Sequence, residues 1–135
     1  MYKRQVFISV KDTDKPAAIG VAREFVGLGF TVHATAGTAE MLAEAGVPVK
    51  TLLKIQEGRP NVLDLIKNGE IHFILNTPSG QQPRRDEVSI RSAAVAARVA
   101  TMTTLRGARA SVAAIRAIQQ SGYGVRSLQE YHAQQ

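Results

Sequence analysis

The 135-residue chain contains no cysteine and no tryptophan, and aromatic residues make up 5% of it. The absence of cysteine excludes disulfide bonds, thiolate nucleophiles and cysteine-ligated zinc. No apolar run approaches the roughly 20 residues that a membrane-spanning helix needs, and the first residues, MYKR, are unlike the start of a secretory signal peptide. We therefore expect a cytoplasmic, soluble protein without a membrane partner.

Acidic residues are scarce in the second part of the chain. Residues 1–83 carry nine lysines and arginines against eight acidic residues, whereas residues 84–135 carry eight arginines against three acidic residues. A basic region of this kind attracts anions and is a first sign of nucleic-acid binding. The arginines are spaced singly along predicted helices, however, and few aromatic residues accompany them. We therefore expect no nucleic-acid partner, but a solvated or partner-facing surface that attracts anions.

Short runs rich in β-branched residues alternate with amphipathic stretches along the chain. This alternation predicts an α/β fold in one domain of residues 1–135, with a parallel sheet covered by helices on both faces. The expected strands are residues 5–10, 30–35, 47–54, 71–76 and 99–103, and the expected helices are residues 15–29, 38–46, 59–69, 86–99 and 107–122. Because residues 71–76 form the most apolar strand, we place that strand at the centre of the sheet. Residues 77–85 are predicted to form a loop.

Polar residues follow the predicted strands directly. They are Ser9, Lys11, Asp12 and Lys15 after the first strand, Thr35, Gly37 and Thr38 after the second, Lys54 after the third, and Asn76, Thr77, Ser79 and Gly80 after the fourth. Ligands of open α/β sheets bind beyond the C-terminal ends of the strands, so these residues should share one rim. Lysines, hydroxyl groups and glycines at a helix N-terminus are typical of a phosphate site. The alternative is that such residues cap helices, as Thr38 would cap the helix of residues 38–46.

Four stretches carry a family resemblance. They are ISVKDTDK (8–15), ATAGTAEMLAEAGV (34–47), KIQEGRPNVLDLIKNGEIHFILNTPSG (54–80) and DEVSIRSAAVAARV (86–99). Together they resemble the C-terminal allosteric domain of the carbamoyl-phosphate synthase large subunit, which is a methylglyoxal-synthase-like domain. The resemblance runs from about residue 5 to residue 132. It implies a three-layer domain with a five-stranded sheet in the order 3-2-1-4-5, and a chain that is a fragment of a longer synthase.

The resemblance also implies a function. Such domains bind UMP as an inhibitor or IMP as an activator, and so control carbamoyl phosphate synthesis for the pyrimidine and arginine pathways. The parent ligase would use ATP with magnesium or manganese, and it would hydrolyse glutamine in a separate small subunit that contacts the synthetase domains. We expect no cofactor and no metal in the domain itself, because His33, His72 and His132 lack metal-ligand spacing. A homo-oligomer is a further expectation.

The site residues follow from the same resemblance. The effector phosphate would be bound by Lys15, Thr35, Gly37, Thr38 and Lys54, and the base and ribose would be contacted by Ser9, Asn76, Thr77, Ser79 and Asp86. Pro78 replaces a hydroxyl donor of the family pattern NTTSG, which bears on base or ribose selectivity. Residues 101–103 read Thr-Met-Thr where ornithine-regulated members have Tyr-Asp-Thr, so we do not expect regulation by ornithine.

The alternative is a lyase of the methylglyoxal synthase type, acting on dihydroxyacetone phosphate. That reaction needs a carboxylate base within reach of the phosphate. Where that family has a Gly-Asp-Gln segment, this chain has Gly58-Arg59-Pro60, and arginine stays protonated and cannot act as a base. Asp12 and Glu57 are nearby carboxylates, but loop solvation and helix capping explain them. We therefore expect no catalytic residue in this domain, and a site that senses its ligand.

Overall fold

Five short strands pair into one parallel sheet in the computed structural model, which describes residues 4–78 and 85–121. The strands are β1 (Gln5–Ser9), β2 (Thr31–Thr35), β3 (Lys50–Leu52), β4 (Phe73–Asn76) and β5 (Ala100–Met102). Their order is β3-β2-β1-β4-β5 and every pairing is parallel, with Phe7 opposite His33 on β2 and opposite Ile74 on β4. The predicted five-stranded parallel sheet and its strand order are therefore confirmed.

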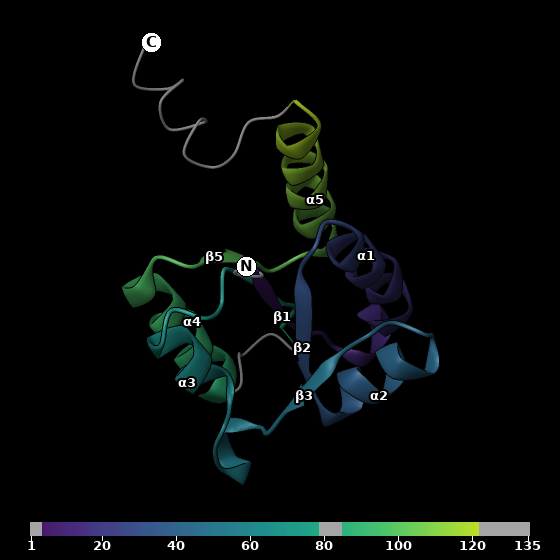
Figure 1. Cartoon of the computed structure of the whole chain (residues 1–135). Coiled ribbons are helices and arrows are strands. Elements are labelled where there is room, and N and C mark those ends of the chain that lie inside the picture. The colour runs from purple at the N-terminus through teal and green to yellow at the C-terminus, as the bar shows by residue number, and fades with distance from the viewer. Residues whose placement is uncertain (1–3, 79–84, 122–135) are drawn as a thin grey trace, which may run out of the picture.

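Helices cover both faces of this sheet (Figure 1). One face carries α1 (Lys15–Gly27), α2 (Ala36–Glu44) and α5 (Leu105–Gln120), and the other carries α3 (Val62–Lys67) and α4 (Arg85–Ala97). Two short 3-10 helices, η1 (Asp12–Asp14) and η2 (Ile55–Glu57), follow β1 and β3. Alternate residues of β1 enter the two cores: Val6 and Ile8 pack beneath α1, α2 and α5, and Phe7 packs beneath α3 and α4. The three-layer arrangement is confirmed.

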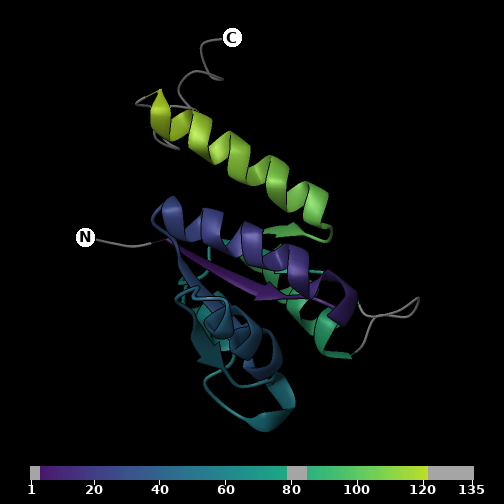
Figure 2. The ribbon, with the colours of Figure 1, turned by 90° about the vertical axis from the view of Figure 1, so that its right-hand side faces the viewer.

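The last helix, α5, packs against α1, and Figure 2 shows the two helices side by side. Val112 and Ile115 of α5 are buried in the shared core. At the surface, the Gln119 side-chain amide donates to the Leu28 carbonyl at 3.1 Å, and Arg116 pairs with Glu24 at 3.7 Å. Over the two described ranges, no helix combines the length and apolarity that a membrane crossing requires.

Three boundaries near the rim differ from those expected. Helix α2 begins at Ala36, because Thr35 has extended backbone angles and occupies the N-cap, so the alternative in which Thr38 caps this helix is wrong. Strand β3 ends at Leu52, which leaves Lys54 outside the sheet. Helix α3 begins at Val62, because Asn61 has extended backbone angles and caps the helix, its side-chain oxygen accepting from the Leu63 N–H at 2.9 Å.

The centre of the sheet and the start of α5 were also predicted incorrectly. The middle strand is β1, and β4 is an inner strand between β1 and β5. Both strands are apolar and covered on both faces, so their composition does not order them. Helix α5 starts at Leu105, because the Thr104 hydroxyl accepts from the Gly107 N–H at 3.0 Å and caps the helix. Arg85, expected in the loop, begins α4, and residues 79–84 lie outside the described part of the chain.

Two histidines near the N-terminal edge of the sheet have lowered pKa values. His33 is buried on β2, its Nε2 contacts Gln5 Oε1, and its Nδ1 has no hydrogen-bond partner within residues 4–78 and 85–121. Burial lowers the pKa of His33, and the nearby Lys50 lowers it further. Burial also lowers the pKa of His72, whose Nδ1 accepts from the Gln5 N–H at 3.0 Å.

We therefore expect the free energy of unfolding to fall as the pH drops below about 6.5. Both histidines have folded-state pKa values below the ordinary 6.5, so the unfolded chain binds more protons in that window. Urea denaturation at about pH 7.5 and about pH 5.5 measures the effect, and His33→Gln should reduce the difference. The Asp64 pKa is lowered by its hydrogen bond to Arg59, so this carboxylate affects stability only at lower pH. Equal stability at both pH values would contradict the prediction.

Candidate functional site

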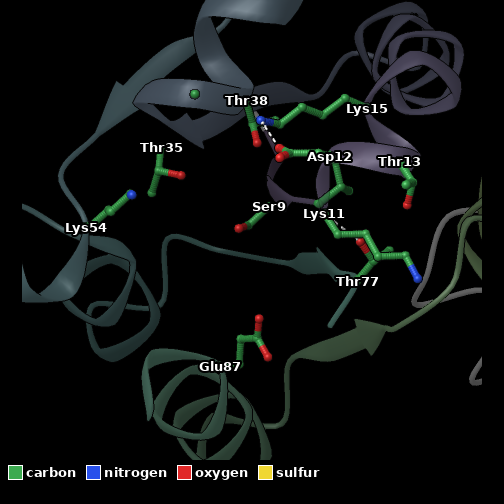
Figure 3. A pocket seen from close by; sticks show the side chains of 12 residues that line it. Ser9, Lys11, Asp12, Thr13, Lys15, Thr35, Thr38, Lys54, Thr77 and Glu87 are labelled. Atoms are coloured by element: carbon green, nitrogen blue, oxygen red, sulfur yellow. Dashed lines mark hydrogen bonds and ion pairs between the residues drawn. The ribbon is translucent and has the colours of Figure 1, made fainter. Parts of the chain in front are cut away.

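A cavity of about 500 Å³ opens beyond the C-terminal ends of β1, β2 and β4. Figure 3 shows the polar side chains that surround it. The lining residues are Ser9, Val10, Lys11, Asp12, Thr13, Lys15, Thr35, Gly37, Thr38, Lys54, Thr77 and Glu87. The location is the one expected for an open parallel sheet, because the loops after neighbouring strands meet at this edge.

The first turn of α2 forms one wall of the cavity. Thr35 is the N-cap, its side chain makes no capping hydrogen bond, and the residue lines the cavity. Gly37 and Thr38 follow in the first turn and also line the cavity. The amides of a first turn have no partner within their own helix, and the helix dipole favours negative charge there. This wall is therefore suited to bind an anion.

Two lysines reach this wall from different elements. Lys15 begins α1, and its Nζ lies beside Thr38 and 2.7 Å from Asp12 Oδ1 (Figure 3). Lys54 precedes η2 and points toward Thr35, and its backbone N–H donates to Glu57 Oε1 at 2.7 Å. No ion pair among the described residues involves the Lys54 ammonium, which is therefore ready for an anionic ligand.

Thr77 ties together the loops that follow β1 and β4. Its N–H donates to the Ser9 carbonyl at 3.1 Å, and its hydroxyl accepts from the Lys11 N–H at 2.9 Å. Thr77 is buried at the cavity wall. The residue expected to contact base or ribose thus holds in place the turn that leads to Lys15.

A smaller cavity of about 100 Å³ adjoins the first and shares Ser9, Thr35, Lys54 and Glu87 with it. Its remaining lining residues are Phe7, Leu53, Ile55, Gln56, Val62, Asn76, Asp86 and Ile90. Apolar side chains from the α3 and α4 face of the sheet therefore lie beside three polar groups, the Gln56 and Asn76 amides and the Asp86 carboxylate. The combined site has a polar, cationic part and a more apolar part.

The structure brings most of the expected site residues together. All five predicted phosphate ligands and Thr77 line the larger cavity, Asn76 and Asp86 line the smaller one, and Ser9 lines both. Ser79 lies outside the described residues. Glu87 and Gln56 were not predicted as site residues. Glu87 was missed because it lies in the first turn of a predicted helix. An acidic residue at that position is explained by the helix dipole alone.

Carboxylates that could act as a base are few at this site. Asp12 and Glu87 line the larger cavity, and Asp12 is paired with Lys15. None of residues 58–60 lines either cavity, and Arg59 instead pairs with Asp64 at 2.6 Å. Within residues 4–78 and 85–121, no three histidine, aspartate or glutamate side chains are grouped to bind a metal. The arrangement is chemically suited to holding a phosphate ester.

The chain is similar in sequence to carbamoyl phosphate synthase large chains. It is 48% identical over 126 residues to the large chain of Nostoc sp., an alignment that covers 93% of this chain and 11% of that protein. It is 47% identical over 135 residues to the large chain, C-terminal section, of Aquifex aeolicus, with 96% of this chain and 25% of that protein covered. The chain thus spans between 11% and 25% of the length of these curated relatives.

Solved structures and a family model agree with this. The methylglyoxal synthase of Elizabethkingia anophelis superposes with a TM-score of 0.68 at 14% identity, over 82% of this chain and 78% of that chain. ForH superposes with a TM-score of 0.61 at 14% identity, over 94% of this chain and 87% of that chain. At such identities the likeness concerns the fold. The model of the MGS-like domain matches residues 17–103, more than half of the chain, and the protein therefore belongs to the MGS-like domain family.

Proposed function

We propose that this protein is a regulatory domain whose cavity binds a nucleoside monophosphate, either UMP as an inhibitor or IMP as an activator. The observation that carries the proposal is the convergence of Lys15, Lys54 and the first turn of α2 on one cavity. Two ammonium groups, two threonine hydroxyls and helix N-terminal amides are the donors that a phosphate monoester needs. Such a set supports the binding of a phosphate monoester.

The smaller cavity lies next to this phosphate cradle, and we expect the nucleoside there. Asn76 can donate and accept hydrogen bonds, and Phe7 and Ile90 offer apolar contact to a flat ring. The four residues that both cavities share place the two parts side by side. A ligand with an anionic end and a planar, partly apolar end matches this arrangement.

The parent protein is proposed from the curated relatives, which are named as carbamoyl phosphate synthase large chains. We take this chain to be the regulatory part of an ATP-dependent, glutamine-hydrolysing carbamoyl-phosphate synthase of the cytoplasm. ATP with magnesium or manganese would then act in the synthetase domains, and the glutaminase small subunit would be a further partner. Carbamoyl phosphate made there would supply the pyrimidine and arginine pathways.

Regulation requires that the effector binds two states of the synthase with different affinities. UMP and IMP share the phosphate, so opposite effects must arise where their bases lie. Asn76 lines that part of the site, and Pro78 stands two residues farther along the segment that leaves β4. We expect this segment to reshape around the base and alter the contact with the synthetase domains.

Calorimetric titration of the chain with UMP and with IMP tests the proposal. Saturable binding of either nucleotide with one site per chain is the expected result, and the two affinities rank the effectors. Uridine and inosine without the phosphate should bind at least about tenfold more weakly, because the charge-assisted hydrogen bonds are lost. A chain that binds neither nucleotide would overturn the proposed function.

Gly37→Ala should stabilise the fold and weaken phosphate binding. Alanine is favoured over glycine in a helix by up to about 1 kcal/mol, and the new Cβ would lie 3.5 Å from Lys15 Nζ, an ordinary contact. The methyl group would occupy space that a phosphate needs beside the α2 amides, so affinity should fall roughly tenfold. Thermal denaturation and calorimetry measure the two effects.

Gly20→Ala is the matched control for this substitution. Gly20 lies in α1, lines neither cavity, and has nothing within 4 Å of an added Cβ. It should raise stability and leave phosphate affinity unchanged. Equal affinities of Gly37→Ala and Gly20→Ala would contradict the role given to Gly37.

A lyase acting on dihydroxyacetone phosphate is the second candidate, because Asp12 lines the cavity and the fold is that of methylglyoxal synthase. The reaction would release inorganic phosphate and methylglyoxal. We expect no release above the uncatalysed rate, since the Asp12 carboxylate is engaged by the Lys15 ammonium. Phosphate release that is abolished in Asp12→Asn would favour the lyase over the sensor.

A further inference from the structure

The first turn of α4 brings a carboxylate to the junction of the two cavities. Glu87 lines both of them, and Figure 3 shows its carboxylate pointing into the larger cavity from the α4 side, across from Ser9. An acid in the first helical turn is favourable to the dipole wherever its side chain points. The orientation toward the ligand space is a separate observation that the dipole does not explain.

Charges of opposite sign lie on different sides of the larger cavity. Lys15 and Lys54 approach the α2 wall beside the two threonines, whereas Glu87 enters from α4 (Figure 3). The other acidic lining residue, Asp12, is 2.7 Å from Lys15 Nζ and belongs to the cationic side. Like charges repel, so a phosphate is held at the α2 wall and kept away from Glu87. The rest of a ligand bound in this way can extend past Ser9 toward Glu87 and the smaller cavity.

A carboxylate only accepts hydrogen bonds, so a ligand that reaches Glu87 must offer O–H or N–H groups. Ribose hydroxyls and ring N–H groups of a nucleoside both meet this requirement. A second phosphate in the same place would meet a like charge in a partly enclosed cavity. We infer that Glu87 is a specificity-determining residue, which accepts hydrogen bonds from the nucleoside part of the ligand and excludes ligands with a second phosphate there. This inference rests on the proposed binding of a nucleoside monophosphate.

The test is calorimetric titration of wild type and Glu87→Gln with inorganic phosphate, UMP and uridine 3′,5′-bisphosphate. Glutamine keeps the size of the side chain and removes its charge. Phosphate alone should bind about threefold more tightly to Glu87→Gln, because a repelling charge is gone. UMP should lose affinity relative to phosphate by about tenfold, because a charge-assisted hydrogen bond becomes a neutral one. The preference of wild type for UMP over the bisphosphate should shrink by a similar factor.

Controls separate this role from a structural one. Glu44→Gln makes the same change in net charge at an exposed position of α2 that lines neither cavity, and its ligand ratios should equal those of wild type. Glu87→Asp keeps the charge but shortens the reach, so phosphate affinity should stay as in wild type while UMP weakens. The same titrations with 2′-deoxy-UMP distinguish the ribose hydroxyl from the ring N–H: if Glu87 accepts from the 2′-hydroxyl, the deoxy ligand binds wild type and Glu87→Gln equally.

The outcomes are distinguishable. UMP binding in wild type with unchanged ligand ratios in Glu87→Gln would overturn the role of Glu87 and leave the proposed function standing. Wild type that binds UMP no more tightly than phosphate would overturn the proposed function and the inference with it. If circular dichroism shows that Glu87→Gln is unfolded, Glu87→Asp becomes the deciding variant. Equal losses of phosphate and UMP affinity in Glu87→Asp would overturn the inference and indicate a structural role only.

Discussion

Lys54→Ala should weaken phosphate and nucleotide binding by about 1.5–3 kcal/mol, the range for hydrogen bonds to charged groups, which corresponds to roughly 12- to 140-fold in affinity. Lys54 stands outside the sheet, its side chain points toward Thr35, and both cavities include it. Its ammonium takes part in no ion pair within the described ranges, so an anion gains this partner without displacing another. The effect of removing it should therefore be among the largest at the site.

Calorimetry with UMP, IMP and inorganic phosphate measures the loss. Lys67→Ala removes the same charge from the last turn of α3, away from both cavities, and should change affinity by less than about twofold. Lys54→Arg keeps the charge and should fall between the two. An affinity of Lys54→Ala equal to that of wild type would remove this residue from the site.

The sequence predicted the fold well because each local pattern agreed with the global one. Alternation of short apolar strands with helices requires a parallel sheet with both faces covered, and glycines and polar residues marked most of the connections. Boundaries were less accurate. Helix α3 was expected from residue 59 because Pro60 suits a first helical turn, yet it begins at Val62, after a capping box that Asn61 and Asp64 form.

The sequence predicted which residues gather at the C-terminal edge of the sheet, but not how their side chains are oriented or paired. The rule that strand ends converge was enough to collect Lys15, Thr35 and Lys54, although the strand that ends before Lys54 is shorter than expected. The spacing of residues along the sequence does not reveal where their side chains point or which hydrogen bonds they form. The Lys11 N–H donates a hydrogen bond to the Thr77 hydroxyl, and the Glu87 side chain points into the cavity. Both features depend on loops that meet only in the folded chain.

Phe25→Ala should reduce the free energy of unfolding by about 3–5 kcal/mol, the cost of removing a fully buried aromatic ring from a packed core. Phe25 is completely buried, and its ring centroid lies 5.1 Å from that of Phe30 in an edge-to-face arrangement and 6.3 Å from that of Phe73. Phe30 precedes β2 and Phe73 begins β4, so this aromatic cluster lies at the N-terminal edge of the sheet. The loss is a large share of the 5–15 kcal/mol that typically stabilises a domain.

Because the cavity lies at the opposite, C-terminal edge of the sheet, Phe25→Ala should leave the nucleotide affinity of the folded protein nearly unchanged. Urea denaturation gives the stability, and titration at a temperature where the variant is fully folded gives the affinity. Phe25→Leu refills much of the volume and should cost less, on the order of 1–2 kcal/mol. Parallel loss of stability and affinity would mean that the aromatic cluster also positions the phosphate cradle. Retained affinity would mean that the aromatic cluster at the N-terminal edge stabilises the fold without positioning the ligand site at the opposite edge.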